Sequence, residues 1–161
     1  MTLNHNKLIF IIEDNDLYSL MLDYNISNES IARCMCFRTG EECIGALDMN
    51  PMMIILDYEL PGMNGKETLK KIKALKPEIP VIILSIKGDP QLIRELLEEG
   101  AFEYLMKEPD SVKKLKKIIN SKINKLTKDE WRTILRMKLF LFFVLVSSLV
   151  IVAFYLKRYL E

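Results

Sequence analysis

The sequence predicts an α/β fold built on a doubly wound parallel sheet of five strands, with one apolar helix added near the carboxyl end. Five short apolar runs alternate with amphipathic segments, a rhythm typical of parallel α/β sheets. The third and fourth runs are almost entirely aliphatic, as in strands that helices cover on both faces. Residues 139–156 contain no charge, proline or glycine, which sets them apart from the rest of the chain.

The five expected strands are the apolar runs at residues 7–12, 31–37, 52–56, 81–85 and 102–106. Between them, apolar residues recur every three or four positions, which predicts helices at 15–27, 40–49, 65–76 and 89–100. A fifth helix is expected at 110–126, where the fold closes. Thr127 and Glu130 then form a capping-box pattern, which predicts that another helix starts there.

The composition limits the function classes. A chain of 161 residues has room for one domain with a core, plus an appendage. The formal net charge of +1 gives no global electrostatic argument for nucleic acid, so no nucleic-acid partner is expected. Three cysteines (Cys34, Cys36 and Cys43) and no recognisable export signal fit a reducing compartment. Cys34 and Cys36 share a strand face, but with no histidine or acidic cluster near them, buried free thiols are expected rather than a metal pair.

Polar residues follow four of the five expected strands. In a parallel sheet such residues gather at one edge, where these folds bind ligands. Here they are Glu13 and Asp14, then Asp57, Ser85 and Lys107. Three carboxylates brought together repel one another unless a hard divalent cation compensates them, and Mg²⁺ is the natural choice. Lys107 and Ser85 would complement a phosphoryl group, and Asp57, at the centre of the edge, is placed to act as its nucleophile.

Four motifs carry a family resemblance. In order and spacing, "IIEDND", "IILDYELPGMNG", "VIILS" and "FEYLMKEPD" resemble the receiver domain of two-component response regulators, over roughly residues 6–125. The resemblance implies a flavodoxin-like sheet with strand order 2-1-3-4-5. It also implies a phosphoacceptor rather than an enzyme: Asp57 takes a phosphoryl group from the phosphohistidine of a histidine kinase or of a phosphotransfer protein.

The same resemblance implies a metal shell. Asp14 and Asp57 would bind Mg²⁺ directly, Glu13 would act through a water molecule, and the backbone carbonyl of Glu59 would complete the coordination.

It also implies a switch, in which Ser85 turns toward the acyl phosphate and Tyr104 matches the family's rotameric aromatic residue. Because Tyr104 alternates with Phe102 and Met106 along a strand, a plain packing role is equally compatible with the sequence. The loop after Asp57 also matches the family, at Pro61, Gly62 and Gly65.

The sequence departs from the family at four positions. Glu108 separates the lysine from Pro109, which leaves open whether the bond before that proline is cis as is common in the family. Ile86 stands where a small residue is usual, and Glu59 and Lys87 carry opposite charges that can pair across the pocket mouth. Our hypothesis is that this bulk and pairing shield the acyl phosphate from water and lengthen its lifetime.

Alternative readings of the same residues are weaker. An acid after a strand can simply cap a helix, but coincidence at four strand ends is improbable. A flavodoxin-type phosphate site needs hydroxyls and glycine after the first strand, whereas "EDND" repels an anion. A haloacid-dehalogenase-type phosphatase carries its nucleophile on the first strand with a second Asp two residues later. Here Asp57 lies on the third strand, and Glu59 follows it.

The apolar segment 139–156 predicts a transmembrane helix. Eighteen residues rise about 27 Å, close to the roughly 30 Å hydrocarbon core of a bilayer. Fourteen of them are Leu, Ile, Val or Phe, which together favour insertion by about 4 to 8 kcal/mol. A buried soluble helix is the alternative, but the predicted sheet domain closes without it.

The flanking charges predict the orientation. Six basic residues precede the segment and two follow it, which places the receiver on the cytoplasmic side of the inner membrane. We therefore expect a receiver domain at 1–126, a basic juxtamembrane helix at 127–138, a single span at 139–156 and a short extracytoplasmic tail at 157–161. A homodimer is left open, since no pattern of small residues indicates tight helix pairing.

These features together predict a membrane-tethered, single-domain response regulator that signals by contact with an effector protein that the sequence does not identify. Two alternatives use the same fold: a docking or scaffold protein that is not phosphorylated, and a phosphate sink that drains a kinase.

Overall fold

The computed structural model describes residues 7–29 and 32–160, with side chains described throughout except at 29, 127, 130 and 149–160. The chain divides into two compact units, residues 1–120 and 121–161.

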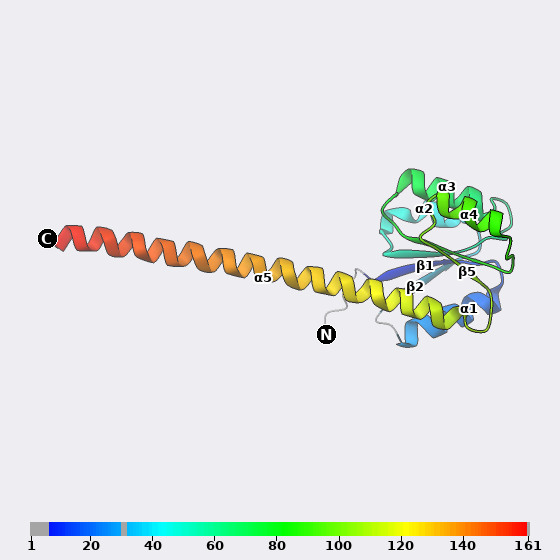
Figure 1. Ribbon diagram of the computed structural model, residues 1–161, viewed down its shortest axis with the longest axis horizontal. Helices are drawn as coiled ribbons and strands as arrows, with labels where there is room; N and C mark the ends of the chain where they lie inside the picture. Colours follow the sequence, from blue (N-terminus) through cyan, green and yellow to red (C-terminus); the bar gives the residue numbers. More distant parts are fainter. Residues whose placement is uncertain (1–6, 30–31, 161) are drawn as a thin grey trace. The chain divides into compact units, whose positions relative to one another are not determined.

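The first unit is built on a five-stranded parallel sheet with the order β2-β1-β3-β4-β5 (Figure 1). This confirms the predicted sheet and its strand order. The strands lie within one or two residues of the predicted runs: β1 (Leu8–Ile12), β2 (Arg33–Phe37), β3 (Met53–Asp57), β4 (Val81–Ser85) and β5 (Glu103–Met106).

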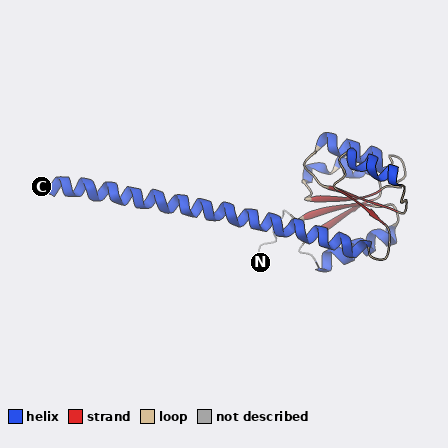
Figure 2. Cartoon of the chain, in the orientation of Figure 1, coloured by secondary structure: helices blue, strands red, loops and turns tan. Residues whose placement is uncertain are grey.

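Helices cover both faces of this sheet, as Figure 2 shows by colour. One face carries α2, α3 and α4, and the other carries α1 (Figure 1). The helices and one short 3₁₀ turn are α1 (Asp16–Glu29), α2 (Gly40–Gly45), η1 (Leu47–Met49), α3 (Gly65–Leu75), α4 (Pro90–Glu98) and α5 (Ser111–Leu160). The single helix predicted at 40–49 is thus two elements, because Gly45 is a weak helix former and α2 ends there.

Local signals define the helix ends. Asn64 caps α3 in a reciprocal capping box with Glu67, and Asp89 caps α4, whose first residue is Pro90. Gly100 follows α4 with a φ of 98°, a conformation that glycine adopts without steric cost. These caps fix the points at which the chain leaves each helix and returns to the sheet.

The core lies between the sheet and its helices. Every residue of β3 and β4 is buried, which agrees with their aliphatic sequences. From α3, Leu69 and Ile72 reach the same core cluster and are fully buried. Each such side chain contributes about 1.5–3 kcal/mol of hydrophobic stabilisation. The central strands β3 and β4 are therefore buried along their whole length, and they end at the candidate site.

Of two expectations at the carboxyl end, the helix start is corrected and the transmembrane span stays a prediction. The predicted helix start at Thr127 is wrong: α5 continues through it, and residues 111–160 hold no proline or glycine to break the helix. Among the residues that the structure describes, no helix is long and apolar enough to cross a membrane. The predicted span at 139–156 extends past Ser148, and its remaining side chains lie outside the described residues.

The three cysteines are free thiols, but they are not all buried. Cys43 is buried and Cys34 partly so, whereas Cys36 is exposed, so the expectation of a buried thiol is wrong for Cys36. Strand β2 lies at an edge of the sheet, which leaves its side chains more open to solvent. Burial raises the pKa of both Cys34 and Cys43 to about 12, which keeps them protonated and disfavours metal binding.

The core can be tested within one helix. Leu69→Ala removes a fully buried side chain of α3, so we expect the free energy of unfolding to fall by about 2–5 kcal/mol. Leu75→Ala is the matched control, because Leu75 lies on the same helix but is 60% exposed, and its cost should stay below about 0.5 kcal/mol. Urea denaturation followed by circular dichroism measures both. Equal costs for the two variants would contradict the described packing of α3.

Candidate functional site

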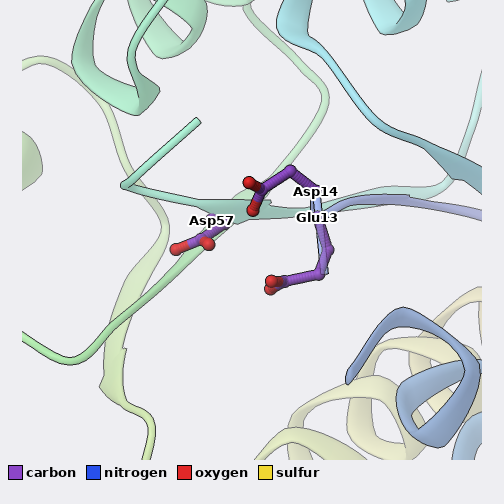
Figure 3. A group of neighbouring side chains, drawn as sticks. All are labelled: Glu13, Asp14 and Asp57. Atoms are coloured by element: carbon purple, nitrogen blue, oxygen red, sulfur yellow. The ribbon is translucent and has the colours of Figure 1, made fainter. Parts of the chain in front are cut away.

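Three carboxylates meet at the carboxyl edge of the sheet, as predicted. Glu13 and Asp14 follow β1, and Asp57 is the last residue of β3 (Figure 3). One oxygen from each lies within 4.8 Å of the others. Glu13 and Asp57 are buried, at 3% and 5% exposure, while Asp14 is exposed. The cluster therefore has a buried floor and one side open to solvent.

Backbone pairing places these residues. The hydrogen-bonded ladder continues one residue past the strands: the amide of Tyr58 donates to the carbonyl of Leu84, and that of Lys107 donates to the carbonyl of Ser85. The amide of Glu13 likewise donates to the carbonyl of Phe37. Residues far apart in sequence are thus held in register at one edge, which is the arrangement that the sequence predicted.

Lys107 lies between two of the acids. Its Nζ is 2.7 Å from Oε2 of Glu13 and 2.8 Å from Oδ2 of Asp57. The side chain is only 15% exposed, and the same Nζ lies 4.6 Å from the centre of the Tyr18 ring. The structure therefore brings the predicted lysine to the predicted acids, with an aromatic face beside it.

The ionisation of the site reflects these contacts. Burial raises the pKa of Glu13, and repulsion by Asp57 adds to this, although the hydrogen bond from Lys107 acts in the opposite direction. For Lys107, burial acts to lower the pKa, but hydrogen bonds to Asp57 and Glu13 outweigh it and leave the pKa raised. Lys107 therefore stays charged at neutral pH.

The donor set fits Mg²⁺. With all groups ionised, three carboxylates and one ammonium leave an excess of two negative charges. Carboxylate oxygens are hard ligands, and Mg²⁺ binds to a few of them while it keeps several waters. The open side at Asp14 leaves room for those waters. Receiver-type magnesium binding is therefore compatible with the chemistry of these residues.

Ser85 and Tyr104, the predicted switch pair, both contact the backbone of Lys87. Ser85 is fully buried, and its Oγ accepts a hydrogen bond from the Lys87 amide at 3.0 Å. Tyr104 is also buried, and its hydroxyl donates to the Lys87 carbonyl. The sequence did not indicate that one residue of the β4–α4 loop links the two. Their switching role stays a prediction.

The expected ion pair between Glu59 and Lys87 is present. Nζ of Lys87 is 2.9 Å from Oε1 of Glu59, and both side chains are about half exposed. The hydrogen bond that Lys87 donates to Glu59 raises the pKa of Lys87. Ile86 is 65% exposed beside them. The pairing is present as predicted, while its effect on access and the metal role of the Glu59 carbonyl stay predictions.

The loop after Asp57 depends on Gly65. A Cβ there would lie 2.6 Å from Cα of Tyr58 and 2.7 Å from the carbonyl oxygen of Asp57, and both are backbone atoms that cannot move aside cheaply. Gly62 has a φ of 74°, so it too occupies a position that suits glycine. The bond before Pro109 is trans, which settles the question left open by Glu108.

One supporting residue was not predicted from the sequence. Arg38, just after β2, lies 2.8 Å from Asp16 and also donates to the backbone carbonyl of Asp14 at 3.3 Å. It thereby ties the loop that carries the acidic pair to the neighbouring strand end. Only an exposed arginine at a strand end marked it in the sequence, which is too common a feature to indicate this role.

Comparison with known proteins agrees with this geometry. Residues 9–120 match the response regulator receiver domain family. The chain is 30% identical to the DNA-binding transcriptional regulator NtrC of Salmonella typhimurium over 101 residues, which is 62% of this chain and 21% of that protein. It is 33% identical to the protein-glutamate methylesterase/protein-glutamine glutaminase of Bacillus licheniformis over 108 residues, 65% of this chain and 30% of that protein.

Solved structures show the same fold. The signal receiver domain of a protein assigned as a Luxo repressor from Vibrio parahaemolyticus superposes with a TM-score of 0.69 at 24% identity, and covers 78% of this chain and 96% of that one. The chain belongs to the response regulator receiver domain family. Its receiver is a phosphoacceptor module of two-component signalling, and the similarity to the methylesterase is confined to less than a third of that enzyme.

The charge balance can be tested at Lys107. Lys107→Met leaves Glu13 and Asp57 facing each other without a cation, so we expect a loss of about 2–4 kcal/mol of stability, less than for a fully buried pair. Added Mg²⁺ should raise the melting temperature of this variant more than that of the parent chain. Lys114→Met is the control, because Lys114 is exposed and its Nζ lies 3.8 Å from Oε2 of Glu108, which is exposed as well. Equal Mg²⁺ responses in all three proteins would refute the proposed compensation.

Proposed function

We propose that the protein is a membrane-tethered response regulator that accepts a phosphoryl group on Asp57 and signals by contact with another protein. The observation that carries the proposal is the position of Asp57: buried at the end of a central strand, beside an acidic pair and bonded to Lys107. The family supports phosphoacceptor chemistry, whereas the tether and the partners rest on arguments from this chain.

The chemistry follows from the site. A carboxylate oxygen of Asp57 attacks the phosphorus of a phosphohistidine, so an O–P bond forms, the N–P bond breaks, and the histidine nitrogen leaves with the electron pair. Asp14 and Asp57 would hold Mg²⁺ directly, with Glu13 acting through water and the Glu59 carbonyl completing the shell, and the ion would supply charge compensation for the phosphoryl oxygens. Lys107, which is bonded to Asp57, would place its ammonium group beside an oxygen of the transferred phosphoryl group.

The switch would act through Lys87. In the structure, the Ser85 hydroxyl accepts a hydrogen bond from the amide of Lys87. When the hydroxyl turns to a phosphoryl oxygen, this hydrogen bond is lost. Tyr104 holds the carbonyl of the same residue, so the β4–α4 loop is restrained from both sides. An effector contact on the face formed by α4, β5 and the first turns of α5 would sense this loop.

A kinase or phosphotransfer protein is the partner that the site requires. Helix α1 begins next to the acidic pair and leaves Leu17, Leu20 and Tyr24 exposed, at 64% or more. Their spacing of three and four residues places them along one side of the helix. A stripe of this kind suits a partner helix that brings its phosphohistidine to Asp57.

The membrane tether is supported by the apolar part of α5. Eight consecutive side chains, Leu139 to Val146, are large, apolar and each at least 40% exposed. Such a row is rare on a water-soluble surface and is typical of contact with lipid. The flanking charges favour a single pass through the inner membrane with the receiver in the cytoplasm.

A docking protein that is not phosphorylated is the second candidate. Ile86 and Glu108 favour it, since each departs from the family next to a site residue, Ile86 after Ser85 and Glu108 after Lys107. A phosphate sink for a kinase would share the chemistry of Asp57 but would lack an effector. A homodimer is compatible with any of the three.

Labelling tests the phosphoacceptor. Incubation with a phosphorylated histidine kinase and Mg²⁺ should transfer label to the parent chain, and Asp57→Asn should abolish it, because an amide is not a nucleophile toward phosphorus. Asp48→Asn is the control, since Asp48 is exposed and lies outside the acidic cluster. Labelling that persists in Asp57→Asn would assign the acceptor elsewhere, and no labelling of the parent chain by any kinase would favour the docking protein.

The lifetime of the acyl phosphate tests the pocket mouth. Ile86→Ala together with Lys87→Ala removes the bulk and the ion pair, so water should reach the phosphoryl group more easily and the half-life should fall several-fold. Lys71→Ala with Leu75→Ala likewise removes one lysine and one large aliphatic side chain, from the exposed side of α3, and should leave the half-life unchanged. Loss of protein-bound label over time measures both. A half-life in the first variant equal to that of the parent chain would sink the shielding hypothesis.

Fractionation tests the tether. The full chain should stay with the membrane after a high-salt wash, because hydrophobic insertion does not depend on ionic strength. A chain that ends at residue 126 should appear in the soluble fraction. Release of the full chain by salt alone would contradict a spanning helix.

A further inference from the structure

The charges of the chain are segregated. Residues 1–120 contain 15 Lys and Arg against 19 Asp and Glu, whereas residues 121–161 contain 8 against 3. The net charge of +1 therefore conceals an acidic first unit and a basic second unit. A local excess of positive charge on one short helix indicates an anionic partner more clearly than the total does.

Three of the cations lie directly before the exposed apolar row. Arg132, Arg136 and Lys138 are exposed, and the first two are four residues apart on α5, which places them on one face of the helix. Arg132 lies 3.7 Å from Asp129, with both side chains more than half exposed, so this contact competes weakly with another anion. The guanidinium groups are thus available for phosphate, which they bind in a bidentate manner.

Trp131 lies among these cations. It is 67% exposed, and Leu135, one turn later, is 58% exposed. Tryptophan and arginine are both stable in the headgroup layer of a bilayer, where an apolar body and a polar group are satisfied together. Along the helix the order is cation and tryptophan first, then eight apolar side chains, which is the order of the layers from headgroup to hydrocarbon.

Distance decides which cations take part. With a rise of 1.5 Å per residue, Arg132 lies about 10 Å along the helix from Leu139, and Arg136 and Lys138 lie closer. Lys122, Lys125 and Lys128 lie about 17 to 26 Å from it. Because charges are screened over about 8–10 Å at physiological salt, only the first group is close enough to interact strongly with headgroups.

We propose that Arg132, Arg136 and Lys138, with Trp131, form a headgroup-binding surface selective for anionic phospholipids. This inference rests on the proposed membrane tether and adds the class of lipid that the chain prefers. An anionic protein or nucleic acid is less suitable, since neither would cover the apolar row that begins at the next residue. The attachment of the receiver to the bilayer would then depend on lipid composition.

The single tryptophan of the chain makes the proposal measurable. The full chain is reconstituted into nanodiscs of phosphatidylcholine alone, or of phosphatidylcholine with phosphatidylglycerol, and Trp131 is quenched with acrylamide. We expect weaker quenching in the anionic discs, by about twofold in the quenching constant, and loss of this difference at high salt. For each protein, the quenching constant in the anionic discs is divided by the constant in the phosphatidylcholine discs, so that each protein serves as its own reference.

Two matched variants locate the effect. The ratio should become about one in the triple variant Arg132→Gln, Arg136→Gln, Lys138→Gln. The control is a second triple variant that removes the same charge from the same helix and should leave the ratio unchanged: Lys122→Gln, Lys125→Gln, Lys128→Gln. A ratio of one in the parent chain, with the protein still bound to the discs, overturns the lipid proposal and leaves the tether intact. Failure to enter either kind of disc refutes the tether itself. Equal loss in both variants would assign the effect to total charge and not to these three residues.

Discussion

The ion pairs of Lys107 with Glu13 and Asp57 are the constraint on which the rest of the site depends. Two buried carboxylates at the ends of β1 and β3 repel each other, and Lys107, which follows β5, is the cation that compensates them. Because the three come from separate strands, the compensation requires the complete parallel sheet in its observed register. The local excess of negative charge that remains once Asp14 is counted is what makes the edge suitable for a divalent cation.

A second set of ion pairs runs along the neighbouring side of the fold. Lys66 pairs with Glu95 of α4 and Lys70 pairs with Glu99, the residue that follows α4, so the two pairs repeat at a spacing of four residues. With the pair of Glu59 and Lys87, three contacts link the segment after β3 to the segment after β4. Exposed pairs of this kind contribute little to stability. A rearrangement of the β4–α4 loop can therefore exchange the pair at Lys87 at little energetic cost.

The sequence was sufficient to predict the parallel sheet and the residues of the acidic cluster, because apolar periodicity and the position of acids after strands are properties of the string itself. The strand order was predicted from the family resemblance and not from periodicity. The sequence was not sufficient for contacts made through the backbone. That Ser85 and Tyr104 meet at the amide and carbonyl of Lys87 depends on the path of a loop, which has no periodic signal. The helix start predicted at Thr127 failed for a related reason: a capping pattern permits a helix to begin, but only a breaker before it forces one to end.

A receiver held at a membrane would face different demands from one that diffuses freely. If its kinase lies in the same bilayer, the effective concentration of the pair is raised, so a small docking surface such as the exposed stripe of Leu17, Leu20 and Tyr24 is adequate without tight binding. Weak docking in turn favours rapid release after transfer, since among related complexes affinity varies mainly through the dissociation rate. The shielding ascribed to Glu59 and Lys87 would then have a purpose, because a released receiver must keep its acyl phosphate until it meets an effector.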